Sequence, residues 1–247
     1  MVGVECSEPP SSLQSGGSLH LTPATPRINW LVTEYETMPF YLEHFGVIVG
    51  AISGALAAEG KKVDLFGVIV LALVTALGGG TIRDTVLDVE KGVFWIADSS
   101  FVITAALTGV ATFFVVRFWM VPNKLFMIAD AVVLAMFTML GASKALLLSA
   151  GPVNAVVLGV ITGVAGGILR DVLVGQIPVV FRRETYYYAT AAFAGATLYV
   201  LLEHRWPGNT ANRLISIGLI LIMRVAAIQW KLGLPVFTAS TQNKEKT

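Results

Sequence analysis

Charged residues are scarce in this sequence, and cysteine is almost absent. Only 13% of its 247 residues are charged, 55% are hydrophobic, and the mean hydropathy is +0.74. A soluble domain usually has about 25% charged residues, so this chain has too few charges to cover a surface that faces water. Lipid must therefore be the solvent for most of it. The single cysteine, Cys6, excludes an internal disulfide and any cysteine-based metal cluster.

Motifs of catalysis and cofactor binding are also missing. The sequence contains no phosphate-binding Gly-Lys-Ser/Thr loop, no nucleophile elbow and no paired carboxylates on one helix face. The histidines are scattered at His20, His44 and His204, and no pair has metal-ligand spacing. A formal net charge of +1 and the lack of a basic run give no sign of nucleic-acid binding. The sequence therefore predicts a protein that is not an enzyme, with no catalytic residue, metal, cofactor or nucleic-acid partner.

Seven apolar segments follow a polar start, and each could cross a bilayer as a helix of about 20 residues. Strands of a β-barrel would be half as long and would alternate in polarity, so helices are favoured. The predicted fold class is an all-α integral membrane protein surrounded by membrane lipid. The segments lie near residues 38–58, 64–86, 99–117, 125–147, 153–174, 185–203 and 213–231. Residues 1–37 are predicted to be a flexible N-terminal tail and residues 233–247 a C-terminal tail.

An internal repeat organises the seven segments. A shift of 87 residues aligns helices one to three with helices four to six without a gap. The matches include Gly54 with Gly141, Thr75 with Thr162, Gly79 with Gly166, Gly80 with Gly167, Arg83 with Arg170, Asp84 with Asp171, Phe94 with Phe181, and the acids Glu43 with Asp130. Because three is odd, the second copy enters the membrane from the opposite side, which gives an inverted pair. The predicted domains are residues 38–119, residues 120–208, and an unpaired seventh transmembrane helix at 209–232.

Basic residues in the loops predict the orientation, since cytoplasmic loops are enriched in Lys and Arg. With the N-terminus outside, the inner side carries Lys61, Lys62, Arg117, Lys124, Arg182, Arg183 and Lys231. The outer side then carries Arg27, Lys91, Arg205 and Arg213. This distribution favours an N-terminus outside and a C-terminus in the cytoplasm.

Glycine clusters mark the second and fifth helices, at Gly78–Gly80 and Ala165–Gly167. Glycines at a spacing of four usually allow close helix packing, and Gly159, Gly163 and Gly167 fit that explanation. The triplet Gly78, Gly79 and Gly80 points in three directions, and each glycine weakens a helix by about 1 kcal/mol relative to alanine. We therefore predict a kink or break there, with Ala165, Gly166 and Gly167 at the matching place. Opened carbonyls at membrane depth indicate a permeation path or a binding site.

Charged residues lie inside or close to the predicted spans, where they are costly and need a reason. Arg83–Asp84 and Arg170–Asp171 are neighbours that point about 100° apart on a helix, so we expect that neither pair simply neutralises itself. They either anchor helix ends or guard the two mouths of a path. Further candidates for mouth or gating charges are Glu43, Asp130, Lys144 and Arg224.

Spacing limits how these further charges can pair. Lys144 and Asp130 are fourteen residues apart in one helix, which is roughly 21 Å along its axis, so they cannot pair directly. Arg224 is the best candidate for a partner to an acid from another helix. Alternatively, Arg224 has a structural role and holds the seventh helix to the two repeats.

The run Thr75–Asp84, its second copy ending at Asp171, and Ile177-Pro178 resemble the prokaryotic trimeric intracellular cation (TRIC) channels, also catalogued with a glycine-transporter-type domain. The similarity covers about residues 40–235. It implies a homotrimer in a prokaryotic plasma membrane, with one pore per protomer and helices two and five bent at their glycine motifs. It further implies that potassium is the chief permeant ion. Two residues depart from the pattern: Lys91 stands opposite Pro178, and Ala165 replaces the first glycine of the second triplet.

Two functions from different classes stay open. The first is a trimeric potassium-permeable channel whose kinked helices form the path. The second is a secondary transporter of a small solute such as glycine, because inverted repeats with broken helices suit a transporter equally well. In that case Glu43 or Asp130 could couple protons. A purely structural protein would leave the doubled glycine and Arg-Asp signature unexplained.

Overall fold

The computed structural model describes residues 40–89, 92–118, 122–182 and 188–230, and all regular structure in these ranges is helical. Seven long helices make up the fold: α2 (Phe40–Leu56), α3 (Leu65–Val86), α5 (Ser100–Phe118), α6 (Asn123–Leu147), α7 (Pro152–Leu173), α8 (Tyr188–Arg205) and α9 (Thr210–Trp230). Two short helices, α4 (Phe94–Ala97) and η1 (Val179–Phe181), follow α3 and α7. Helices lie at all seven predicted places, with ends shifted by a few residues. Both predicted tails, the repeat boundary at 119 and 120, and Lys91 lie outside the described residues.

The helices have the length and surface of membrane spans. Five of them, α3, α5, α6, α7 and α9, are long and apolar enough to cross a membrane. The 22 residues of α3 extend over about 33 Å at 1.5 Å each, close to the hydrocarbon thickness of a bilayer. Within the described residues α2 is shorter, and α8 ends in the polar residues Glu203, His204 and Arg205. Large apolar side chains such as Phe66, Leu107 and Ile222 are exposed, which suits contact with lipid.

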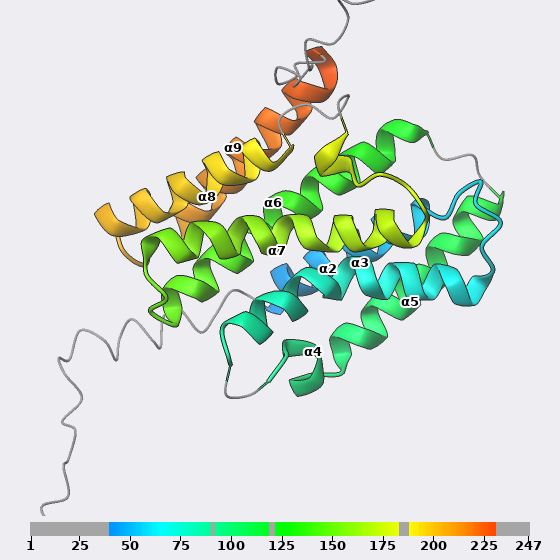
Figure 1. Ribbon diagram of the computed structural model, residues 1–247, viewed down its shortest axis with the longest axis horizontal. Coiled ribbons are helices and arrows are strands. Elements are labelled where there is room, and N and C mark those ends of the chain that lie inside the picture. The colour runs from blue at the N-terminus through cyan, green and yellow to red at the C-terminus, as the bar shows by residue number, and fades with distance from the viewer. Residues whose placement is uncertain (1–39, 90–91, 119–121, 183–187, 231–247) are drawn as a thin grey trace, which may run out of the picture.

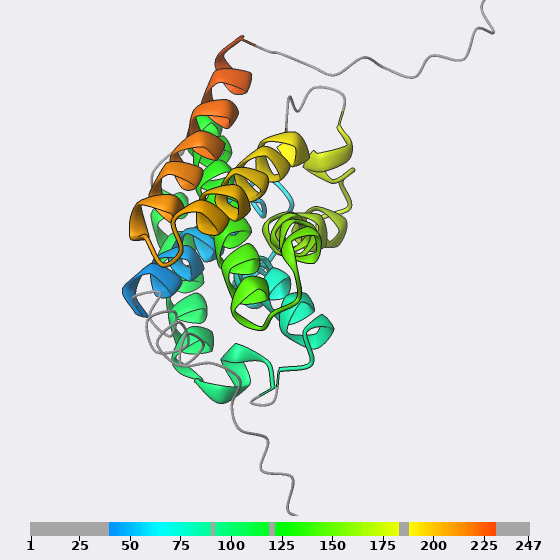
Figure 2. The ribbon, with the colours of Figure 1, turned by 90° about the vertical axis from the view of Figure 1, so that its left-hand side faces the viewer.

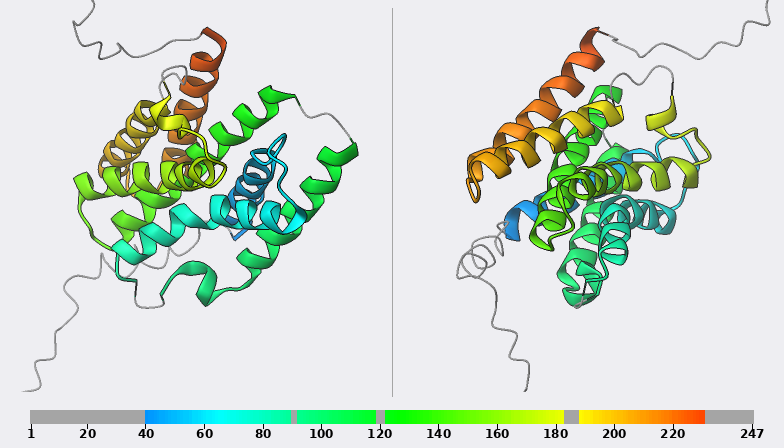
Figure 3. Two further views of the ribbon diagram at one scale, coloured as in Figure 1. Left: turned by 45° about the vertical axis from the view of Figure 1, so that its right-hand side comes forward. Right: turned by 60° about the vertical axis from the view of Figure 1, so that its left-hand side comes forward.

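Helix α6 is the central helix of the bundle. Its most apolar window is 72% buried, whereas the other four long spans are 22–50% buried. Helices α8 and α9 run side by side along one side of the molecule, and α5 lies on the opposite side (Figures 1, 2 and 3). Gly195 of α8 makes this pairing close, because a Cβ at that position would overlap the side chain of Ile220 on α9.

The repeat is visible in matching contacts. Helices α2, α3 and α5 form the first half and α6, α7 and α8 the second, while α9 has no counterpart. Thr75 Oγ1 donates a hydrogen bond to the Leu71 carbonyl at 2.6 Å, and Thr162 Oγ1 does the same to the Leu158 carbonyl at 2.5 Å. These two threonines therefore make the same contact in the two halves.

Helices α3 and α7 cross where their glycines meet. A Cβ on Gly79 would overlap the carbonyl oxygen of Thr162, and a Cβ on Gly166 would overlap the carbonyl oxygen of Thr75. Both helices stay continuous through this point, so neither is broken there, while a kink at these glycines stays a prediction. The reason is that these glycines allow two backbones to touch, which lets the helices cross closely without opening either one.

The remaining glycines of the first triplet face other neighbours. A Cβ on Gly78 would lie 2.8 Å from Leu169 Cδ1 of α7, and one on Gly80 would lie 2.5 Å from the ring of Phe94. The triplet therefore serves three separate close contacts, since consecutive residues point in three directions around a helix. In the second half, Ala165 is buried, and a Cβ on Gly167 would lie 3.2 Å from the Tyr188 hydroxyl.

Candidate functional site

Each half of the molecule holds a charged cluster next to the crossing of α3 and α7. The second-half cluster consists of Asp130 on α6, Arg170 and Asp171 on α7, Arg224 on α9 and Ser53 on α2. Arg170 Nη1 donates to Asp130 Oδ1 at 2.8 Å and to Ser53 Oγ at 2.7 Å, while its Nε donates to Asp171 Oδ1 at 2.9 Å. Arg224 Nη2 lies 3.9 Å from Asp130 Oδ2. These groups connect α6, α7 and α9 through contacts between opposite charges, and the hydrogen bond to Ser53 adds α2.

Aromatic rings and a backbone amide close this second-half cluster. The guanidinium carbon of Arg170 lies 4.8 Å from the centre of the Phe126 ring, and that of Arg224 lies 4.6 Å from the centre of the Tyr188 ring. The backbone N–H of Val179 donates to Asp171 Oδ2 at 2.7 Å. The charged side chains of this cluster are at most 4% exposed. Such buried charges are tolerated because each faces an opposite charge.

The first-half cluster contains the repeat counterparts of Asp130, Arg170 and Asp171, together with Lys144, and is connected differently. It consists of Glu43 on α2, Arg83 and Asp84 on α3, and Lys144 on α6. Asp84 Oδ1 accepts from Arg83 Nε at 2.6 Å and from Lys144 Nζ at 2.8 Å, and its Oδ2 accepts from the Phe94 backbone N–H at 3.0 Å. Across the described ranges, the Glu43 carboxylate takes part in none of the ion pairs. Glu43 and Arg83, whose counterparts bond directly, are thus left apart.

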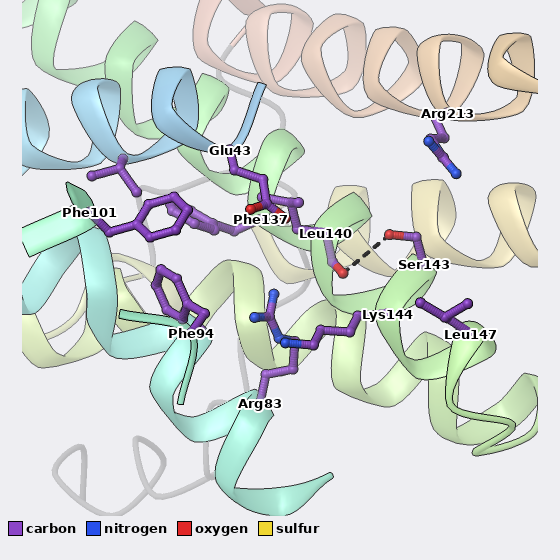
Figure 4. A pocket seen from close by; sticks show the side chains of 12 residues that line it. Glu43, Arg83, Phe94, Phe101, Phe137, Leu140, Ser143, Lys144, Leu147 and Arg213 are labelled. Carbon is purple, nitrogen blue, oxygen red and sulfur yellow. Dashed lines mark hydrogen bonds between the residues drawn. The ribbon is translucent and has the colours of Figure 1, made fainter. Parts of the chain in front are cut away.

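A cavity of about 230 Å³ occupies the space beside this first-half cluster. Glu43 reaches it from α2 and Arg83 from α3, and the two side chains point toward the same space (Figure 4). Its other polar lining residues are Ser143 and Lys144 of α6 and Arg213 of α9. The apolar lining comes from Val47, Gly80, Phe94, Phe101, Phe137, Leu140 and Leu147. The cavity therefore offers one carboxylate and several cations to a small solute.

One sequence-based prediction about the charges needs correction. The neighbouring Arg83–Asp84 and Arg170–Asp171 pairs do form ion pairs, at 2.6 and 2.9 Å. The Cβ atoms of adjacent helix residues point about 100° apart, but the arginine side chain is long enough to bend back to the neighbouring carboxylate. The ungapped repeat aligned Phe94 with Phe181, but the amide that binds Asp171 belongs to Val179. The donor amide follows Asp171 by eight residues in the second half and follows Asp84 by ten residues in the first half.

Other predictions about pairing are confirmed. Arg224 contacts an acid of another helix, Asp130. Asp130 and Lys144 do not pair with each other, because they belong to different clusters along α6.

Sequence reasoning missed several residues of the site. It did not find Ser53 as a partner of Arg170, nor Lys144 as a partner of Asp84. It also did not single out Tyr188, whose side chain is buried next to Arg224. The spacing of Ser53 could have indicated its role. Ser53 lies one turn from Gly50 on the packed face of α2, where a polar side chain needs a hydrogen-bond partner. The part of the chain that the structure describes contains no group of three or more potential metal ligands.

The class of protein that this fold and site define is a helical membrane protein with two inverted repeats, a seventh helix and a buried charged cluster in each repeat. A family model described as glycine transporter matches residues 40–117 and again residues 127–204. The inner membrane protein YadS of Escherichia coli K12 is 43% identical over 206 residues, which cover 80% of this chain and 95% of YadS. A membrane protein of Vibrio cholerae is 40% identical over 212 residues, 83% of this chain and 85% of that protein.

Solved structures give the same assignment. A structure described as the basis for conductance through TRIC cation channels matches with a TM-score of 0.73 and 33% identity, covering 82% of this chain and 98% of that one. The TRIC trimeric intracellular cation channel orthologue from Rhodobacter sphaeroides matches with a TM-score of 0.73 and 38% identity, covering 78% and 97%. This chain belongs to the glycine transporter family of membrane proteins, and it is related to the prokaryotic TRIC channels.

Proposed function

We propose that the chain is a cation channel that conducts monovalent cations, chiefly potassium, down their electrochemical gradient. The observation that carries this proposal is its 33–38% identity and 0.73 TM-score to solved TRIC cation channels, over 97–98% of their length. The Rhodobacter sphaeroides orthologue is described as trimeric, which supports a homotrimer with one path in each protomer. The inner-membrane relative YadS supports a location in a prokaryotic plasma membrane.

In this proposal the path runs past the crossing of α3 and α7. The first-half cavity reaches Gly80, next to the crossing glycine Gly79, and would form one mouth. On the other side, Arg170 and its partners fill the protein interior. Such an arrangement fits a closed state, and conduction requires the group around Arg170 to move aside. The charges at both mouths would set ion preference and gating.

Planar-bilayer recording of the purified protein in asymmetric potassium chloride tests the proposal. We expect unitary currents that reverse close to the potassium equilibrium potential, because a selective cation path excludes chloride. Bilayers with protein unfolded by heat provide the control. Reversal at the chloride potential, or a bilayer without unitary events, would contradict the channel.

A second candidate function is a carrier for a small solute such as glycine. The description of the matching family model favours it, and inverted repeats are a common architecture of secondary transporters. Uptake of glycine into liposomes under a proton gradient, without unitary currents, would replace the channel by a carrier. Glu43→Gln and Asp130→Asn would then separate the two carboxylates that could couple protons.

The orientation is a further part of the proposal. An N-terminus outside and a C-terminus in the cytoplasm agree with the basic loop residues. Cys6, the single cysteine of the chain, provides a direct test. A membrane-impermeant maleimide should label Cys6 in intact cells, and Cys6→Ser should remove the label. Labelling only after cell lysis would place the N-terminus inside.

A further inference from the structure

His44 is a titratable side chain on α2 that the proposed path does not use. Its Nε2 lies 3.0 Å from Ser100 Oγ at the start of α5, and its Nδ1 lies 3.0 Å from the Phe40 carbonyl oxygen. The imidazole stacks on the ring of Phe101, with ring centroids 4.3 Å apart. Phe101 and the neighbouring Glu43 both line the first-half cavity (Figure 4). His44 is therefore in contact with the wall of that cavity.

The hydrogen bonds of His44 can be kept in both of its protonation states. The Phe40 carbonyl oxygen can only accept, so Nδ1 carries a hydrogen, and in the neutral ring Nε2 accepts from the Ser100 hydroxyl. After uptake of a proton Nε2 becomes a donor and the hydroxyl accepts, because a serine hydroxyl can do either. The hydroxyl hydrogen can then turn to the carboxylate of Asp98, which already accepts from the Ser100 backbone N–H at 2.9 Å. The imidazole can therefore gain a charge without losing a contact.

The charged groups that face His44 are carboxylates. Glu43 precedes it on α2, and Asp98 precedes α5. Helices α4 and α5 add no charge at this end, since the charged residue of α5, Arg117, belongs to its last turn. The other charges around Glu43 and the cavity come from α3, α6 and α9: Arg83, Asp84, Lys144 and Arg213. A positive charge on the imidazole would thus lie next to two acids, with the cations of the cavity beyond Glu43.

Such a charge would act on the one carboxylate that lines the cavity. Glu43 is the acid among the lining residues, which also include three cations. Attraction of a cation into the cavity depends on Glu43, and a positive charge on the adjacent residue offsets that attraction. Histidine is the side chain that ordinarily changes its charge between about pH 5 and 8. Mild acid is therefore able to supply this charge.

The repeat leaves the second half without a counterpart of His44. A shift of 87 residues places Ala131 opposite it, and Ala131 is 1% exposed. His204 lies exposed at the end of α8, away from the residues that line the cavity. Sensitivity to acid through His44 is thus a property of the first-half mouth and not of the closed second-half cluster.

We propose that His44 is a proton-binding site that lowers the entry of cations into the first-half cavity when it takes up a proton. This inference rests on the conduction proposed above and adds a means by which acid reduces it. The contacts with Phe40 and Ser100 hold the imidazole beside Glu43 in both protonation states. Uptake of the proton therefore changes the charge at the mouth rather than the fold.

Single-channel recording in symmetric potassium chloride of low concentration tests this site at about pH 8 and about pH 5, which bracket the ordinary histidine range. We expect the parent conductance to be about threefold lower in acid, since a unit charge several ångströms away changes the local cation concentration by this factor when screening is weak. His44→Gln keeps a hydrogen-bonding side chain without a charge and should hold the conductance at the high value in both solutions. His44→Lys carries a charge in both solutions and should hold it at the low value.

The matched control is His204→Gln, which removes an exposed histidine outside the cavity and should keep the pH dependence of the parent chain. Thermal unfolding of each variant separates a change of charge from a loss of folding. An acid effect that persists in His44→Gln would assign it to another group, such as Glu43, and would overturn the proposal. Equal conductances of His44→Gln and His44→Lys would overturn it too.

The same recordings distinguish this site from the channel itself. Parent currents that do not change with pH would overturn the role of His44 and leave the channel standing. A bilayer that stays silent at the higher pH would contradict the channel and, with it, the role of His44.

Discussion

The two charged clusters share three equivalent positions, an acid and an Arg-Asp pair, and reach different structures. In the second half, Arg170 is 1% exposed and bonded to Asp130, Asp171 and Ser53. In the first half, Asp84 accepts from both Arg83 and Lys144, and Glu43 is left at a cavity. An inverted repeat of sequence therefore does not require the two halves to be in the same state.

The seventh helix explains part of this difference. Helix α9 has no counterpart in the repeat, and its Arg224 lies beside Asp130 in the second half. Arg213 lies eleven residues before Arg224 on α9, which is roughly 16 Å along the helix axis. It lines the cavity of the first half. One added helix thus brings a cation to both clusters. In the second half Arg224 faces the ion pair of Asp130 with Arg170, and in the first half Arg213 faces the cavity.

The largest expected effect comes from the crossing that separates the clusters. Gly79→Leu and Gly166→Leu should each prevent folding, because the new side chain would overlap the backbone of the facing helix. Size-exclusion chromatography of detergent-solubilised protein measures this as loss of the monodisperse peak. Gly218→Leu is the control, since nothing lies within 4 Å of a Cβ at Gly218. A normal peak for either crossing variant would show that the helices do not touch there.

A smaller effect should distinguish the two acids of the repeat. Asp130→Asn leaves Arg170 and Arg224 buried without a full counter-charge and should cost about 3–5 kcal/mol of stability. Glu43→Gln removes no ion pair seen in the described residues and should cost less than about 1 kcal/mol. Thermal unfolding in detergent compares the two variants. Equal losses would mean that the clusters are energetically alike.

A still smaller change should follow from the charge at the first-half cavity. Lys144→Gln removes a cation from the proposed mouth, so the potassium conductance should rise, most strongly at low salt where screening is weakest. Lys124→Gln, at the exposed start of the same helix, should leave conductance unchanged. Single-channel recording at two salt concentrations measures both variants. An unchanged conductance for Lys144→Gln would place Lys144 outside the path, and a fall would contradict the expected repulsion of cations.

The smallest effect concerns the loop before α5 in the first half. A hydrogen bond from the Ser100 backbone N–H lowers the pKa of Asp98. The ionised carboxylate therefore stabilises the fold above the ordinary aspartate pKa, near 4, and this contribution is lost as pH falls through the lowered value. The difference in thermal stability between the parent chain and Asp98→Asn should shrink below about pH 4. A constant difference across this range would show that the Asp98 charge does not matter.

The sequence alone predicted the helices and their inverted repeat, because span length and residue identity carry that information. The pairing of Arg224 with an acid of another helix also followed from the cost of burying a charge. The bonds from Arg170 to Ser53 and from Lys144 to Asp84 depend on how the helices rotate and cross, which one-dimensional spacing does not give. That α3 continues unbroken through Gly79 could not be predicted for the same reason. The intrinsic weakness of glycine was visible in the sequence, whereas the backbone that packs against it was not.

The central claim is that the first-half cluster faces an open cavity and the second-half cluster is closed. Ser143 lines the cavity and Ser53 is buried against Arg170, so Ser143→Cys and Ser53→Cys are a matched pair in a Cys6→Ser background. Reaction rates with a small charged methanethiosulfonate compare the two positions directly. We predict rapid modification of Ser143→Cys and almost none of Ser53→Cys. Equal rates, or faster modification of Ser53→Cys, would contradict the claim.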